Sequence, residues 1–277
     1  MSKRDRNEAP DELVAVGGAP NWLENYMGPQ DESHEGMGEY RVLPRLTIVQ
    51  SMSDEGIRDE YGDGAVVITE GNVLIAEKGE PFDFTPLLFF KEFIHWRDRR
   101  EKHSDGPIID RSFNETGPIA LRARDKEQRQ EYYDGGPKDK PFEMSWLEHL
   151  NFIGVIYAGE FAGTECVASF KRGEFWTGKN YINKIGMRKI GGKAVPLWST
   201  VWTFFSELHT SKTDPNAKWF GYNIRPAEIP TIKADLAQTF FDNHLKLKTD
   251  QAEKKLRVDH ANDDVTDTGE NADDSEL

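Results

Sequence analysis

The sequence predicts a mainly β fold, a barrel or a sandwich of short strands covered by one helix. Three observations predict it. Runs of β-branched and aromatic residues recur along the middle of the chain with Gly, Pro, Asn and Asp between them, as is typical of strands joined by turns. One segment near the C-terminus has the spacing of a long helix. Hydrophobic residues make up 37% of the 277 positions, which is enough to bury a core.

Eight segments have strand character. In chain order they are residues 43–49, 65–69, 72–76, 82–90, 150–157, 165–171, 198–205 and 218–224. Glu70 and Gly71 predict a hairpin between the second and third segments. Phe93, Ile94 and Trp96 extend the fourth segment, and periodicity alone leaves open whether this extension is strand or helix.

The later part of the chain adds a helix and an insertion. Pro230 introduces the predicted helix, about residues 231–257, whose apolar residues recur at helical spacing. Before it, alternation places Trp198 and Trp202 on one face of their strand. Residues 97–140 contain polar clusters such as RDRREKHSDGP and predict a long exposed loop insertion, which is either functional or a simple insertion.

The charge is concentrated at the two ends of the chain. The net charge is −14, of which residues 1–39 contribute −6 and residues 259–277 contribute −8, so that the body is neutral. Both ends are too polar to bury a core. We therefore expect a disordered acidic lead-in at 1–40, a β-rich nucleic-acid-binding domain at 41–225, a C-terminal helix at 226–258 and a disordered acidic tail at 259–277.

Several classes of protein are excluded by the sequence. No apolar run approaches the roughly 20 residues that cross a bilayer, and the N-terminus lacks the apolar region of a signal peptide. A single cysteine, Cys166, excludes an internal disulfide and a cysteine-rich zinc site. Neither an HExxH nor a GxSxG motif is present. We expect a cytoplasmic protein, in the host cytoplasm if it is viral, that is not an enzyme and has no cofactor or metal.

Two motifs resemble ligand sites and are set aside. Residues 173–180, GEFWTGKN, match the spacing of a phosphate-binding loop, but Asn180 replaces the Ser or Thr that binds magnesium, and we interpret the segment as a basic hairpin loop. In the tail, Asp259, Asp263 and Glu270 match three positions of an EF-hand loop, but the glycine at its sixth position is missing.

The remaining signal is a stretch of mixed basic and aromatic residues. Residues 170–193 carry seven cations and one acid, Glu174. Single-stranded nucleic acid is bound by such mixtures, because cations follow the phosphates while rings stack on bases. Phe175 and Trp176 are the preferred stacking pair, since neighbours on a strand point in opposite directions. The candidate nucleic-acid-binding residues are Phe170, Lys171, Arg172, Phe175, Trp176, Lys179, Tyr181, Lys184, Arg188, Lys189, Lys193, Trp198 and Trp202.

A second interpretation of this stretch stays open. In it, Phe170, Trp198, Trp202 and Phe204 belong to the core and the lysines form a solvated surface. The acidic tail favours the first interpretation, because a tethered polyanion can occupy a basic groove until DNA displaces it and can then recruit other proteins.

Five segments together resemble single-stranded-DNA-binding proteins of tailed bacteriophages. They are PRLTIVQSMS at 44–53, PFDFTPLLFF at 81–90, SFKRGEFWTGKNY at 169–181, PLWSTVWTFFSE at 196–207 and WFGYNI at 219–224, followed by the acidic tail. The resemblance implies an OB-fold, a five-stranded barrel that binds single strands, with a role in DNA replication and recombination and without a cofactor. It also implies that the tail contacts replication proteins such as a polymerase or a helicase–primase.

The tail of such phage proteins often ends in an aromatic residue, whereas this chain ends in Leu277. We expect partner binding by Asp273, Asp274, Glu276 and Leu277, and a homodimer is possible. Two rival functions are kept. One is a viral structural or assembly protein with a jelly-roll-like module, and the other is a nuclease or nucleotide-dependent enzyme built on the Gly173 loop.

Overall fold

The computed structural model describes residues 42–51, 53, 55–98, 108–133, 141–211, 216–253 and 256. The acidic lead-in, the acidic tail and the four tail residues named above lie outside these described residues. All statements about structure refer to the described part of the chain.

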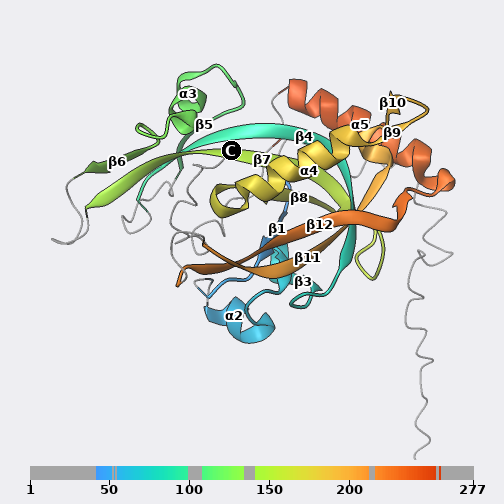
Figure 1. The fold of residues 1–277 in the computed structure, drawn as a ribbon, viewed down its shortest axis with the longest axis horizontal. Coiled ribbons are helices and arrows are strands. Elements are labelled where there is room, and N and C mark those ends of the chain that lie inside the picture. The colour runs from blue at the N-terminus through green and yellow to red at the C-terminus, as the bar shows by residue number, and fades with distance from the viewer. Residues whose placement is uncertain are drawn as a thin grey trace, which may run out of the picture. The chain divides into compact units, whose positions relative to one another are not determined.

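The described strands confirm the mainly β prediction. Ten of them form one curled sheet that resembles half of a barrel, in the order β12-β11-β4-β7-β8-β1-β2-β3, with β5 added to β4 and β6 added to β7 (Figure 1). Only β1 and β8 pair in parallel among the described strands. The ten strands are β1 (Arg45–Ile48), β2 (Val66–Ile68), β3 (Val73–Ala76), β4 (Phe82–Trp96), β5 (Ile108–Ser112), β6 (Gln130–Tyr133), β7 (Phe142–Ile156), β8 (Glu165–Phe170), β11 (Thr200–Thr210) and β12 (Lys218–Thr231).

Each predicted strand corresponds to one of these strands, and the structure resolves the open question about the fourth. The extension with Phe93, Ile94 and Trp96 is strand, so that β4 runs over 15 residues beside the equally long β7. The predicted hairpin at Glu70 and Gly71 is present as a 3₁₀ turn, η3 (Glu70–Asn72), between β2 and β3. Gly71 takes a positive φ of 71° there, which glycine adopts without strain.

Helices lie on both faces of the sheet. Helix α4 (Phe175–Met187) lies across the sheet in Figure 1 and packs with Leu150 and Phe152 of β7. Helix α5 (Ala237–Ala252) packs instead with Ile153 and Val155. Because neighbouring side chains of a strand point to opposite faces, these two sets of β7 residues build two separate cores. The other described helices are α2 (Glu55–Tyr61) and α3 (Pro118–Arg124).

The C-terminal helix is shorter than predicted. Pro230 and Thr231 still belong to β12, and a 3₁₀ turn, η6 (Ala234–Leu236), precedes α5. The expected start at residue 231 is therefore wrong by six residues, because the edge strand continues through the proline. Proline is tolerated at a sheet edge, where its missing N–H faces no partner strand.

The predicted loop insertion at 97–140 contains regular structure. Within it β5 and β6 pair with the distal halves of β4 and β7, so that these strands form a four-stranded arm, β5-β4-β7-β6, with α3 packed against it. The insertion was predicted as loop because each of these pieces is short and polar, although β5 and β6 pair with the strands that are next to them along the chain, β4 and β7.

Side chains join the two ends of the curled sheet. The Gln50 side chain, just after β1, donates to Phe220 O of β12 at 2.6 Å and accepts from Phe220 N at 2.8 Å. Ser206 of β11 donates to Gly64 O and accepts from Gly79 N at 3.0 Å. These bonds replace strand pairing where the half-barrel would otherwise be open.

Candidate nucleic-acid interface

The basic and aromatic stretch is a helix followed by a hairpin. After β8, a 3₁₀ turn η4 (Arg172–Glu174) leads into α4, and the two-stranded hairpin of β9 (Lys189–Ile190) and β10 (Lys193–Ala194) follows. The interpretation of residues 173–180 as a hairpin loop is therefore wrong. The helix turns Phe175, Ile182 and Ile185 towards the core that β7 lines, and tertiary packing of this face overrides the weak helix propensity of its glycines and asparagines.

The helical conformation also excludes a phosphate-binding loop at this place. Such a loop presents free backbone N–H groups before the helix begins, whereas α4 begins at Phe175 and already contains Gly178 and Lys179. Gly178 has a packing role instead, because a Cβ there would lie 2.7 Å from Phe170 Cβ. The glycine of this motif that lies in α4 therefore allows the helix to pack closely against the core.

Three of the predicted stacking rings are buried. Phe170 and Trp202 are 0% exposed and Tyr181 is 1% exposed. Tyr181 packs edge-on against Trp202, with 5.1 Å between ring centroids, and burial raises the pKa of its phenol. The expectation that these rings stack on bases is wrong, because they form the contact between α4 and the sheet.

Trp198 lies on the other face of the sheet from Trp202. It belongs to a 3₁₀ turn, η5 (Leu197–Ser199), before β11 begins, so the predicted alternation does not reach it. Its ring packs against Phe241 of α5, with centroids 5.6 Å apart. It also lines a pocket of about 270 Å³ together with Lys193 and Lys233.

The acid of the basic stretch, Glu174, holds η4 against β12. Its carboxylate accepts hydrogen bonds from Tyr222 N at 2.9 Å and from Trp219 Nε1 at 3.3 Å. A Cβ on Gly221 would overlap Glu174 Oε1, so a larger residue at this position would displace the carboxylate. The single negative charge of the stretch is therefore used within the fold.

Two of the predicted cations bind the same edge strand. Lys184 donates from Nζ to Ile224 O at 2.6 Å, and Arg188 donates to Pro230 O at 2.8 Å. Together with Gln50 and Glu174, these side chains satisfy backbone groups along the edge of β12, which protects it from pairing with another strand. Both side chains also contribute positive potential near the C-terminal end of α4.

Lys171 and Arg172 lie apart from the helix surface. Lys171 Nζ lies 5.8 Å from the centroid of Trp96, on the face of β8 opposite to Phe170. Arg172 opens η4 with a positive φ of 44°. Both are half-buried.

Phe175, Trp176 and Lys179 come together at the start of α4. Lys179 Nζ lies 4.6 Å from the ring centroid of Phe175 and 4.6 Å from that of Trp176, and Lys179 is exposed. Phe175 also packs against the core, and both Phe175 and Trp176 are half-buried. Cations and accessible rings are the two components that single-stranded nucleic-acid sites combine, and both are present here. The remaining predicted cations, Lys189 and Lys193, lie in the hairpin beyond the other end of α4.

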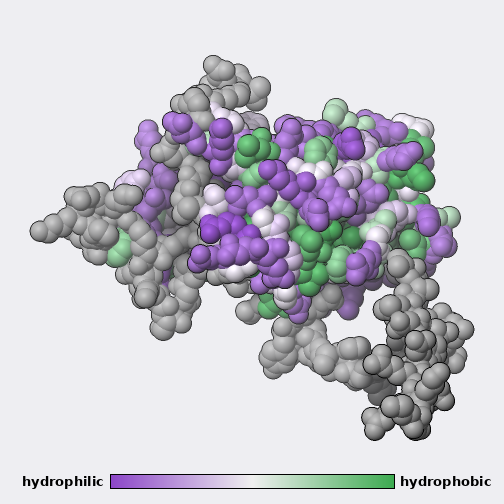
Figure 2. Space-filling model, turned by 90° about the horizontal axis from the view of Figure 1, so that it is seen from below, coloured by the Kyte–Doolittle hydropathy of each residue, from purple (hydrophilic) through white to green (hydrophobic). Residues whose placement is uncertain are grey.

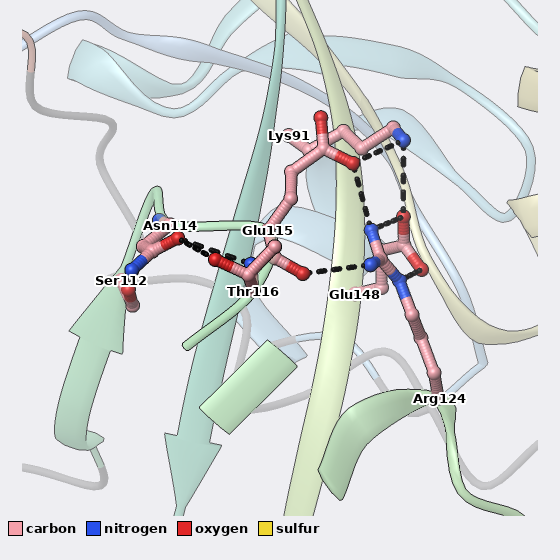
Figure 3. A network of polar contacts seen from close by, with 7 residues as sticks. All are labelled: Lys91, Ser112, Asn114, Glu115, Thr116, Arg124 and Glu148. Carbon is pink, nitrogen blue, oxygen red and sulfur yellow. Dashed lines mark hydrogen bonds and ion pairs between the residues drawn. The ribbon is translucent and has the colours of Figure 1, made fainter. Parts of the chain in front are cut away.

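A polar network that the sequence did not indicate fixes the arm. Glu115 accepts from Lys91 Nζ at 2.8 Å and from Arg124 Nη2 at 2.9 Å, and Arg124 Nε also donates to Glu148 at 3.3 Å (Figure 3). Hydrogen bonds from Lys91 and Arg124 lower the pKa of Glu115. In the same view, the Asn114 side chain accepts from Thr116, which orders the turn before α3. The ion-pair partners of this network are 9 to 24 positions apart in the sequence, so no local motif could have revealed them.

An aromatic stack lies beside this network. Trp146 stacks on His95, with centroids 4.1 Å apart, and the Arg122 guanidinium lies 3.5 Å from the indole centroid. Burial and the charge of Arg122 lower the pKa of His95. Trp146 is only 5% exposed, so this stack belongs to the structure of the arm.

The described residues contain no group of three or more His, Cys, Asp or Glu that could hold a metal ion. Cys166 is 0% exposed and burial raises its pKa, as expected of an inert thiol. None of the helices in this part of the chain is both long enough and apolar enough to span a bilayer.

The described part of the chain is a mainly β protein with a curled, half-barrel sheet. Helix α4 packs on this sheet, and the start of this helix combines aromatic side chains with a lysine. A model of a protein family described as Pam3 phage gp34-like protein matches residues 12–257. The chain therefore belongs to this bacteriophage-associated family. No curated protein and no solved structure matches it.

Proposed function

We propose that the protein binds single-stranded DNA with little sequence preference during phage replication and recombination, in the host cytoplasm. The observation that supports this proposal is the contact of Lys179 with Phe175 and Trp176 at the start of α4. Trp176 supplies the stacking ring and Lys179 binds the neighbouring phosphate. The OB-fold of the phage proteins that the sequence resembles belongs to the same proposal, and a curled β sheet is compatible with it.

Electrostatics supports this choice of surface. Lys179 and Lys184 lie in α4 and Arg188 follows it, while Glu174, the one acid of residues 170–193, is engaged by Tyr222 N and Trp219. Positive potential along α4 therefore attracts the phosphates of a strand whose bases reach Trp176. The acidic tail at 259–277 competes for the same surface and, when displaced, binds replication proteins through Asp273, Asp274, Glu276 and Leu277.

Titration of labelled oligo-dT, followed by fluorescence anisotropy, tests the proposal. Trp176→Ala should weaken binding by about 1 to 3 kcal/mol, or roughly 5- to 150-fold, because one base loses its stacking partner. Trp176→Phe should retain most of the affinity, since a ring remains.

Lys246→Ala on the exposed surface of α5 is the matched control for Lys179→Ala. Lys179→Ala should reduce the slope of log affinity against log salt by about 1, and Lys246→Ala should leave it unchanged. Equal affinity of Trp176→Ala and the unchanged protein would remove the support for this site.

A structural or assembly role is the second candidate, favoured by apolar side chains on the arm. Leu121 and Tyr132 are 62% and 63% exposed there, as at a protein contact. Co-sedimentation with phage particles, together with no retention on single-stranded DNA, would favour this role.

A further inference from the structure

The hairpin of β9 and β10 is an exposed basic projection with an apolar side chain. Lys189, Ile190 and Lys193 are all exposed, Ile190 by 67%. Gly191 and Gly192 join the strands with positive φ values of 57° and 80°, as a two-residue turn requires. Neither lysine forms an ion pair with the part of the chain that the structure describes. Ile190 also lines the pocket of about 270 Å³ beside Trp198, and its exposed area is available to a partner surface.

A pocket of opposite charge lies at the mouth of the half-barrel. Its volume is about 900 Å³, and β3, the start of β4, the β7–β8 connection and the end of β12 line it. Ile75, Phe82 and Phe161 provide apolar walls. Its lining contains five acidic side chains and one basic side chain, Arg225. The acidic residues are Glu77, Glu80, Asp83, Glu160 and Glu228.

Apolar and hydrophilic residues are mixed on the surface of this side of the molecule. Figure 2 shows the face on which β3 and α2 lie, where apolar residues (green) gather between hydrophilic ones (purple). Apolar walls with acidic rims suit a ligand that carries an apolar side chain between cations. The hairpin of this chain has that chemistry.

Both surfaces are attached to the same end of β12. Arg188, directly before β9, is bonded to Pro230 O, while Pro226 and Glu228 line the pocket. A hairpin and a complementary pocket at one end of a molecule allow two copies to exchange hairpins about a two-fold axis, so that the same contact forms twice. Hairpin against hairpin would instead oppose like charges.

We infer that two copies of this chain form a reciprocal dimer in which the β9–β10 hairpin of each copy enters the acidic pocket of the other. Ile190 reaches the apolar walls, and Lys189 and Lys193 pair with the carboxylates of the rim. This gives the two hairpin lysines a role in protein contact in place of the DNA contact expected from the sequence. The inference does not depend on the proposed DNA binding.

Sedimentation of the full chain in the absence of DNA tests the inference through a charge exchange. Lys189→Glu with Lys193→Glu places acids on the hairpin, and Glu77→Lys with Glu160→Lys places cations on the pocket. The unchanged chain should dimerise reversibly, and each double variant alone should associate about a hundredfold more weakly, because like charges then face each other.

Mixing the two double variants tests whether the hairpin of one copy contacts the pocket of the other. In their heterodimer both contacts are again between opposite charges, so mixing should restore dimers. Lys246→Glu with Lys248→Glu, on the exposed surface of α5, is the matched control and should dimerise as the unchanged chain does. Circular dichroism confirms that each variant is folded.

A monomeric unchanged chain would overturn the inference, as would dimers that persist in either double variant or a mixture that stays monomeric. If the pocket instead binds a lysine-rich probe peptide while the unchanged chain remains monomeric, the occupant is another protein and the inference is wrong. Because no DNA is present, failure here leaves the proposed function standing, and failure of DNA binding leaves the dimer standing.

Discussion

Gly178 and Gly186 lie in the same helix and have opposite surroundings. A Cβ on Gly178 would lie 2.7 Å from Phe170 Cβ and 3.0 Å from Leu150 Cδ1, whereas a Cβ on Gly186 would meet nothing within 4 Å. The first glycine lets α4 approach the sheet, and the second only lowers helix propensity.

Gly178→Ala is expected to destabilise the protein, because overpacking of about 1 to 3 kcal/mol exceeds the roughly 1 kcal/mol gained in helix propensity. Gly186→Ala should stabilise it by up to about 1 kcal/mol. Urea unfolding of both variants measures the difference. If Gly178→Ala were as stabilising as Gly186→Ala, the close contact of α4 with the sheet would be incorrect.

His95 makes the stability of the arm depend on pH. Burial, and then the charge of Arg122, lower its pKa, so the unfolded chain takes up the proton first as the pH falls. Its contribution to stability is therefore complete above the unfolded value of about 6.5 and is lost as the pH falls through the lowered folded value.

His95→Phe keeps a ring against Trp146 and removes the titration. The free energy of unfolding of the unchanged protein should decline more steeply than that of this variant between neutral and mildly acidic pH. Denaturation at a series of pH values checks this expectation, and parallel pH profiles would refute it.

At the scale of elements, side chains from distant parts of the sequence bind the backbone groups along the edge of β12. Gln50 bonds both backbone groups of Phe220, Glu174 bonds Tyr222 N, and Lys184 bonds Ile224 O. These groups alternate along the strand, which is the pattern expected for an edge that has lost its neighbour.

Gln50→Leu is expected to destabilise the protein by about 2 to 4 kcal/mol, because it leaves Phe220 N and O without their partner in a partly buried place. Gln238→Leu, on the exposed surface of α5, is the control and should change stability by less than about 0.5 kcal/mol. Equal unfolding midpoints for the two variants would show that Gln50 does not close the half-barrel.

The strands could be predicted from the sequence because their signal is local. Runs such as residues 82–90 and 150–157 are mostly apolar, with Asp83, Thr85 and Asn151 as their polar members, and they form parts of the long central strands β4 and β7. Helix α4 could not be predicted in this way, because Gly178 and Gly186 hide its helical spacing and its stability comes from Phe170, Leu150 and other distant residues.

The candidate site was predicted only in part for a related reason. Composition counts rings and cations but does not distinguish a core ring such as Trp202 from a half-buried one such as Trp176. It also does not show that Lys184 and Arg188 bond to β12. Phe175, Trp176 and Lys179 are all candidates from the composition, but their contact depends on the helical spacing of α4, which brings Lys179 beside the residues three and four positions before it.

At the scale of the whole molecule, the segregation of charge is the feature with the largest expected effect. The body is neutral, the tail carries −8, and residues 170–193 are strongly basic. A tethered tail of this charge competes with DNA at high effective concentration.

Removal of residues 259–277 should therefore tighten binding of oligo-dT several-fold or more at low salt, with a smaller gain at high salt, where the attraction of the tail is screened. Replacing the acidic residues of the tail by Asn and Gln should have the same effect as deleting it. Unchanged or weaker binding by both variants would mean that the tail does not compete with DNA.

Photochemical crosslinking tests the proposed interface most directly. Oligo-dT with a photoreactive thymine analogue would be bound to the full chain and irradiated, and the attached peptides would be identified by mass spectrometry. We predict attachment within residues 175–179, lost in Trp176→Ala and reduced by unlabelled oligo-dT but not by duplex. Attachment confined to other segments, or none at binding concentrations, would contradict the assignment of single-stranded DNA to the start of α4.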